Sequence, residues 1–89
     1  MKFPLGRLLV TPGVVAVLER YSESPLPFVA RHASGDWGEV DAEDWQANDE
    51  SLKDGARLLS AYRTSRGEKI WVITEADRSA TTLLLPEEY

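Results

Sequence analysis

The stretch RLLSAYRTSRGEKIWVITEADRSATTLLLP, residues 57–86, decides the fold of this chain of 89 residues. It contains three runs rich in β-branched, aromatic and other apolar residues, and short polar turns at 66–68 and 77–79 separate them. Strands of this length joined by such turns are typical of an antiparallel meander. Apolar residues occupy both alternating faces of the runs. We therefore expect helices to cover one face of the sheet and to leave the other partly covered or free to self-associate.

The segment before this meander predicts an N-terminal strand and two helices. Residues 7–11 form an apolar run of strand length. Thr11 followed by Pro12 is a favourable helix start, with the threonine as N-cap and the proline in the first turn. Ser24 and Pro25 repeat this signal, which indicates a second short helix close behind the first.

A third helix is predicted over residues 42–54. Asp41 is placed to cap its first turn, and Gly55 provides the usual C-terminal stop. No linker, internal repeat or low-complexity tract divides the chain. We therefore expect one domain over residues 1–89, an α+β fold in which an N-terminal strand and two to three helices pack on a C-terminal three-stranded antiparallel meander.

The composition excludes several classes of function. The chain has no cysteine, which rules out disulfides, thiolate metal sites and thiol chemistry and suits the reducing cytoplasm. Its net charge of −5 argues against general affinity for nucleic acids, because such affinity depends on Lys and Arg. Charged residues and prolines interrupt the N-terminal apolar run before a membrane-spanning length of about 20 residues is reached, so we expect no membrane segment. We find no Gly-rich phosphate loop or nucleophile motif, and we expect no cofactor.

The acidic segment DWGEVDAEDWQANDE, residues 36–50, carries seven acidic side chains, two tryptophans and no basic residue. Its spacing lacks the register of an EF-hand loop, so we expect no metal site. Acid–base catalysis requires partly buried carboxylates with separated pKa values, whereas a helix surface leaves carboxylates solvated. Two interpretations are left: a capped and solvated helix without a binding role, and a surface that docks onto a basic protein. The docking surface would consist of Trp37, Asp41, Glu43, Asp44 and Trp45.

His32 is the only histidine, so any proton transfer by a histidine near neutral pH depends on it. At the end of a predicted helix, it can instead be a surface cation that the helix dipole stabilises. For an enzyme directed at RNA or nucleotides, the candidate catalytic residues are His32, Tyr62, Arg63, Arg78 and Thr82. Arg78 with the nearby threonines is also a candidate anion site, and an ordinary hairpin turn is the competing interpretation.

Two long segments of the chain carry a resemblance. RLLSAYRTSRGEKIWVITEADRSATTLLLPEEY (57–89) and RHASGDWGEVDAEDWQAND (31–49) resemble a group of short bacterial reading frames described as hypothetical or plasmid-related, and in some instances as type I restriction subunit M. The resemblance implies a bacterial setting, often on a mobile element, and brings no established activity. It does not imply a methyltransferase, because 89 residues cannot supply both a cofactor-binding sheet and a catalytic loop.

The order of helices before an antiparallel sheet is also similar to that of the RelE/ParE and barnase-like toxins. This resemblance implies RNA cleavage through the residues named with His32, although those toxins are typically basic and this chain is acidic. Three hypotheses follow: a small cytoplasmic accessory protein that binds another protein through its acidic, Trp-bearing surface; a ribonuclease; and a structural homodimer whose sheet or Trp71 forms the interface. We favour the first.

Overall fold

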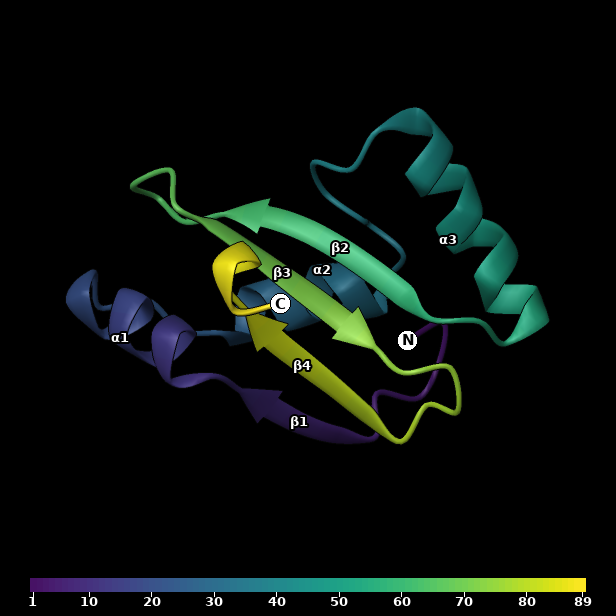
Figure 1. Cartoon of the computed structure of the whole chain (residues 1–89), viewed down its shortest axis with the longest axis horizontal. Helices are drawn as coiled ribbons and strands as arrows, with labels where there is room; N and C mark the ends of the chain where they lie inside the picture. The colour runs from purple at the N-terminus through teal and green to yellow at the C-terminus, as the bar shows by residue number, and fades with distance from the viewer.

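The predicted meander forms three of the four strands of the sheet. In a computed structural model that describes residues 1–89, β2 (Leu58–Arg63), β3 (Lys69–Thr74) and β4 (Ala80–Leu84) pair antiparallel in sequence order (Figure 1). The two short polar turns join them as the sequence predicts. The register places helix-facing side chains of neighbouring strands side by side.

The N-terminal strand departs from the expected arrangement. β1 (Arg7–Val10) joins the same sheet and pairs in parallel with β4, which gives a four-stranded mixed sheet in the order β1-β4-β3-β2. The expected α+β arrangement is therefore matched in part: the meander is present, but the N-terminal strand is a fourth strand of the same mixed sheet. The physical reason is that the meander leaves one edge of β4 without hydrogen-bond partners, and β1 supplies them.

Local capping signals set the ends of the three helices. Thr11 caps α1 (Pro12–Arg20) by accepting a hydrogen bond from the amide of Val14 at 3.3 Å. Asp41 caps α3 (Ala42–Asp54) in the same way, and Gly55 ends it in the left-handed conformation with φ of 75°. These predictions are confirmed.

The second helix starts slightly differently from its predicted pattern. α2 (Leu26–Ala33) begins after Pro25, which has no side chain able to cap it. Ser24 still contributes, because its hydroxyl oxygen accepts from the amide of Leu26 at 3.1 Å. A short 3-10 helix, η1 (Pro86–Glu88), follows the last strand.

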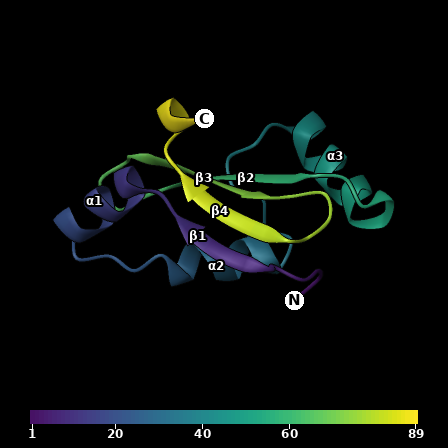
Figure 2. The same ribbon diagram turned by 60° about the horizontal axis from the view of Figure 1, so that its bottom comes forward.

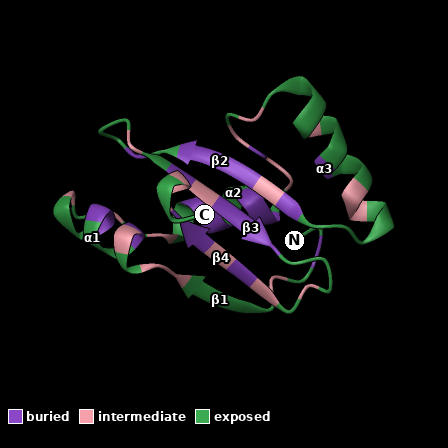
Figure 3. Ribbon diagram, in the orientation of Figure 1, coloured by how far each residue is buried: buried purple, intermediate pink, exposed green.

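The sheet has a helix face and an open face. α2 lies against the helix face, and η1 lies over the opposite face, which we call the open face (Figure 2). The strand residues on the helix face are almost completely buried (Figure 3): Leu58, Ser60, Tyr62, Ile70, Val72, Thr74, Thr81 and Leu83. On the open face, Leu59, Trp71 and Thr82 are only partly buried, whereas Ala61, Ile73 and Leu84 are buried there too. The expected asymmetry of the two faces is confirmed.

Two apolar clusters hold the helices in place. The larger cluster packs Val14 and Leu18 of α1 and Phe28 and Val29 of α2 against the helix face. The smaller cluster lies at the other end of the molecule and consists of Phe3, Trp37 and Leu58, with Trp45 and Leu52 of α3 packed against it.

The third helix does not cover the sheet but flanks its β2 edge (Figures 1 and 2). Asn48 of α3 donates to the Leu59 carbonyl at 2.7 Å and accepts from the Leu59 amide at 3.0 Å. The loop before α3 bonds to Ala61, whose amide donates to the Trp37 carbonyl and whose carbonyl accepts from the Glu39 amide. The outward backbone groups of Leu59 and Ala61 are thus all hydrogen-bonded. Few backbone groups of β2 are therefore free to pair with another strand.

Gly38 allows this close approach, since it adopts φ of 75° and any Cβ there would overlap the carbonyl oxygen of Ala61. We predict that Gly38→Ala lowers the free energy of unfolding by at least about 3 kcal/mol, through left-handed strain plus the overlap. The matched control is Gly67→Ala, at φ of 85° with no atom within 4 Å of the added methyl, which should cost only about 1–2 kcal/mol. Urea unfolding measures both, and equal losses would show that the loop does not depend on contact with β2.

Candidate functional site

The only histidine lies in a buried chain of hydrogen bonds beneath the helix face. His32 is fully buried, with Nδ1 2.5 Å from the Ser60 hydroxyl and Nε2 2.9 Å from the Thr74 hydroxyl. The Thr74 hydroxyl lies 2.7 Å from that of Thr81, which donates to the carbonyl of Leu5 at 2.7 Å. The chain joins α2 to the three strands of the meander and to the N-terminal segment.

The directions of these hydrogen bonds place a proton on Nε2 of the imidazole. The carbonyl of Leu5 only accepts, so the single proton of Thr81 goes to it, and Thr74 must donate to Thr81. Thr74 then accepts from His32, which therefore carries a proton on Nε2. In a neutral ring Nδ1 is an acceptor, and the Ser60 hydroxyl donates to it. A neutral imidazole satisfies the whole chain.

Apolar surroundings reinforce the neutral state. The rings of Phe3 and Trp37 lie edge-on to the imidazole, with centroids 5.3 and 5.5 Å away. Burial, with a smaller contribution from the charge of Arg78, lowers the pKa of His32 to about 4. The interpretation of His32 as a surface cation at a helix end is therefore wrong, and the enclosed ring has no access to a substrate.

The other candidate catalytic residues do not gather around the histidine. Tyr62 is buried on the helix face, where its hydroxyl donates to the carbonyl of Asp36 at 2.5 Å. Arg63 and Thr82 belong to the open face, and Arg63 pairs with Glu39 at 2.8 Å. Four of the five residues proposed for RNA cleavage are thus split between the two faces, and the fifth, Arg78, lies in the turn between β3 and β4.

Arg78 has a structural role at the end of α3. Its guanidinium donates to the carbonyls of Ala56 at 2.6 Å and Ser51 at 3.0 Å, and to two carbonyls of its own turn. Its donors are directed at backbone oxygens, so the structure does not support the predicted anion site. The competing interpretation, a structured hairpin turn, fits the observed contacts.

The tryptophans of the acidic segment face inward. Trp37 is fully buried, and its Nε1 donates to a carboxylate oxygen of Asp49 at 3.0 Å. Its predicted place on a contact surface is wrong, because the glycine-flanked loop turns the indole into the smaller core cluster. Trp45 is partly buried against the same cluster.

The carboxylates of that segment, in contrast, lie in water. Asp41, Glu43 and Asp44 are exposed, and none of them forms an ion pair. Asp41 is engaged as the helix cap through its bond from the Asp44 amide at 2.8 Å. The side chains of Glu43 and Asp44 do not cap the helix.

Two of these exposed carboxylates, Asp41 and Asp44, border a hollow of about 310 Å³ on the open face of the sheet. Its floor is formed by strand residues, and its wall is formed by the loop and the first turn of α3. We call it the acidic groove, and its lining residues are Glu39, Val40, Asp41, Asp44, Leu59, Ala61, Lys69 and Trp71. The tryptophan that lines this groove is therefore Trp71 of β3, outside the acidic segment. Trp45 is partly exposed as well, but it packs against the smaller core cluster.

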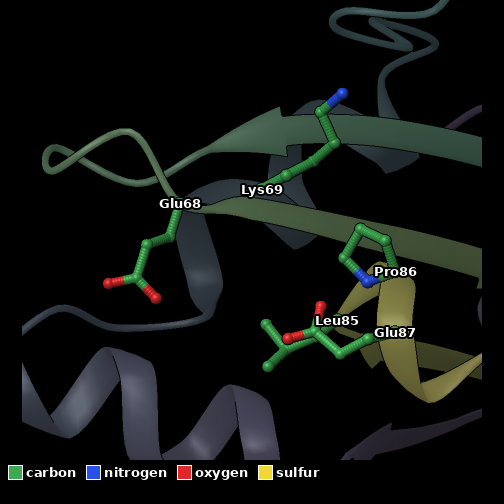
Figure 4. A pocket seen from close by; sticks show the side chains of 5 residues that line it. All are labelled: Glu68, Lys69, Leu85, Pro86 and Glu87. Atoms are coloured by element: carbon green, nitrogen blue, oxygen red, sulfur yellow. The ribbon is translucent and has the colours of Figure 1, made fainter.

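A second hollow of about 230 Å³ lies between the start of β3 and η1 (Figure 4). It shares Lys69 with the acidic groove and adds Glu68, Leu85, Pro86 and Glu87. Figure 4 shows the side chains of Glu68 and Lys69 pointing to opposite sides of the strand. Glu68 bonds to the hydroxyl of Tyr21 and pairs with Arg20 at 3.7 Å, so it serves the attachment of α1.

Sequence reasoning identified the acidic part of this site but missed its apolar part. The period-two pattern places Leu59, Ala61 and Trp71 on one face, which was the available signal. These apolar residues lie next to the carboxylates only because α3 flanks β2, and no local sequence pattern indicates that position of α3.

No group of three or more His, Asp or Glu side chains is arranged to hold a metal ion. None of the helices combines the length and the apolar character needed to cross a membrane. No protein-family model, curated protein or solved structure matches the chain. The resemblances stated from the sequence therefore stay predictions.

The buried histidine predicts an acid-sensitive fold. In the unfolded chain His32 takes up a proton as the pH falls through about 6.5, whereas in the folded protein it stays neutral down to about 4. Its contribution to stability is therefore full above pH 6.5 and is lost on acidification, by roughly 3 kcal/mol between pH 7 and pH 4.

Urea unfolding of the wild type and of His32→Gln across this pH range measures the effect. Carboxylates titrate in both proteins, so the difference between the two free energies of unfolding isolates the histidine. As the pH falls from 7 to 4, we expect the wild type to lose roughly 3 kcal/mol more of its free energy of unfolding than His32→Gln loses. A difference that does not change with pH would contradict the neutral, buried state of His32.

Proposed function

We propose that this protein acts by binding a basic segment of another protein in the acidic groove. The observation that carries the proposal is the combination of a partly exposed apolar floor, which includes Trp71, and a wall of carboxylates. An apolar anchor of the partner would lose water on this floor, while its cations approach the wall. Such a division between apolar core and charged rim is typical of protein interfaces.

The charges of the acidic groove favour a cationic partner. Three of its lining residues are acidic and one, Lys69, is basic. Glu39 already shares its carboxylate with Arg63, but Asp44 has no cation of its own. The net charge of −5 adds a long-range field that attracts a basic partner and repels an acidic one.

Trp71 is suited to the role of anchor because its own surroundings hold it. The ring of Tyr89 lies edge-on at 5.6 Å, and the guanidinium of Arg57 lies 5.5 Å from the centre of that second ring. An indole held in this way loses little conformational freedom on binding, and tryptophan is enriched among the residues that dominate interface energies.

Binding explains the site better than catalysis does. The acidic groove contains no histidine and no hydroxyl side chain, and His32 is enclosed on the other face. RNA would meet a wall of carboxylates, so a ribonuclease would lack a histidine as proton carrier and an electrostatic attraction for its substrate. We extend the proposal to a cytoplasmic accessory role in a bacterial, plasmid- or phage-associated setting, which is supported by the absence of cysteine and by the resemblance of the sequence.

Charge reversal on neighbouring residues tests the proposal. Asp44→Lys changes a residue that lines the acidic groove, whereas Glu43→Lys changes its neighbour outside the groove with the same effect on net charge and on the first turn of α3. The probe is a synthetic peptide that combines lysines and arginines with one leucine. We expect Asp44→Lys to weaken binding about three- to tenfold more than Glu43→Lys, the range of one or two rim charge contacts.

Calorimetric titration gives the affinity, and NMR of the indole Nε1–H of Trp71 reports the location of the peptide. A peptide of the same length with glutamates in place of the basic residues is the control and should not bind. Equal losses in the two variants, or an unmoved Trp71 signal, would indicate general electrostatic attraction and would refute a defined site.

A further inference from the structure

The two edges of the sheet differ in how far they are covered. β2 is closed by Asn48 and by the loop before α3, but β1 has no element along its outer side (Figures 1 and 3). Leu8 is 42% exposed and Leu9 is 39% exposed. A bulge, a proline or a covering loop would block such an edge, and Arg7–Val10 contain none of these; the strand's own protection is its length of four residues and the charge of Arg7.

The hydrogen bonds to β4 show which backbone groups of β1 are free. The amide of Arg7 donates to the Ser79 carbonyl at 2.9 Å, and the amide of Thr11 donates to the Leu83 carbonyl at 3.1 Å. Alternate residues of a strand direct their backbone groups to opposite sides. The N–H and C=O groups of Leu8 and Val10 therefore point away from the sheet.

We propose that this edge binds a second copy of the chain, with the two β1 strands antiparallel and the two four-stranded sheets joined into one of eight strands. In the register that fits, Leu8 of each copy exchanges two hydrogen bonds with Val10 of the other, and Leu9 meets its own counterpart on the two-fold axis. The four outward amides and the four outward carbonyls of the two β1 strands then all have hydrogen-bond partners. The side chains of cross-strand partners also lie on the same side of the joined sheet. A two-fold axis perpendicular to the sheet requires this.

The same register brings opposite charges together. It places Arg7 of one copy opposite Thr11 of the other, and the hydroxyl of Thr11 donates to the carboxylate of Glu88 at 2.6 Å. Within one copy, neither Arg7 nor Glu88 nor the adjacent Glu87 forms an ion pair. The dimer brings Arg7 of one copy close to Glu88 of the other twice, once on each side of the axis. The edge is therefore complementary to itself in hydrogen bonding and in charge.

The strength of this association follows from its size. Four residues per copy make an interface below the roughly 1,200 Å² that stable complexes bury, and two copies of net charge −5 repel each other. We therefore expect a weak, reversible dimer at physiological salt. The acidic groove lies toward β2, at the opposite edge of the sheet, and stays open in this dimer.

Sedimentation equilibrium of the full chain, from about 10 μM to about 1 mM, tests the proposal. Leu9→Lys places two ammonium groups against each other across the axis, and we expect it to weaken dimerisation about tenfold or more. Leu26→Lys is the matched control, because it introduces the same charge at a leucine that is 65% exposed at the start of α2. It should dimerise like the wild type, and circular dichroism verifies that both variants are folded.

Hydrogen exchange locates the contact independently of any substitution. The amides of Leu8 and Val10 should become protected as the protein concentration rises, whereas a dimer formed through Trp71 and the open face would leave their exchange unchanged. A chain that stays monomeric at 1 mM, a dimer equally sensitive to both lysine variants, or exchange independent of concentration would each overturn the proposal.

Discussion

A directional chain of buried hydrogen bonds sets how the parts of this fold are arranged. It starts at the hydroxyl of Ser60, passes through His32, Thr74 and Thr81, and ends at the carbonyl of Leu5. Each proton has one acceptor, so the chain is complete only when α2, the meander and the N-terminal segment are all in place. No buried side-chain nitrogen or oxygen lacks a partner. Removing one member would leave its neighbours unsatisfied in apolar surroundings, which makes this polar chain a means of specifying one arrangement.

Because the only histidine is buried in this chain, the chemical groups accessible at the surface are of other kinds. The residue best suited to proton transfer is neutral and enclosed, and the most exposed chemical features are carboxylates and a half-covered indole on the open face. The flanking position of α3 is decisive here, because it closes the β2 edge and at the same time brings Asp44 to the border of the floor around Trp71. One helix thus both protects the sheet from unwanted pairing and completes the groove that we propose as the binding site.

Features that depend on neighbours in the sequence could be predicted, and features that depend on distant partners could not. The period-two pattern indicates the meander, and Thr11, Asp41 and Gly55 act within one turn of their own helices, so their effects follow from local physics. His32 and Trp37 each owe their burial to segments that meet them only in the folded chain. A partial signal existed, since Ser60 and Thr74 are polar residues on an otherwise apolar strand face, but only the pairing register brings them to one ring. The parallel pairing of β1 was hidden for the same reason.

That parallel pairing also has a consequence for the folding pathway. Arg7 pairs with Ala80 across a separation of 73 residues (80 − 7), whereas every contact within the meander closes a much shorter loop. Loop-closure entropy therefore favours a nucleus made of β2, β3 and β4, with the first strand docking last. Until β1 docks, this strand and the outer edge of β4 are both free to pair. Exchange of β1 between molecules is then a route to misassembly.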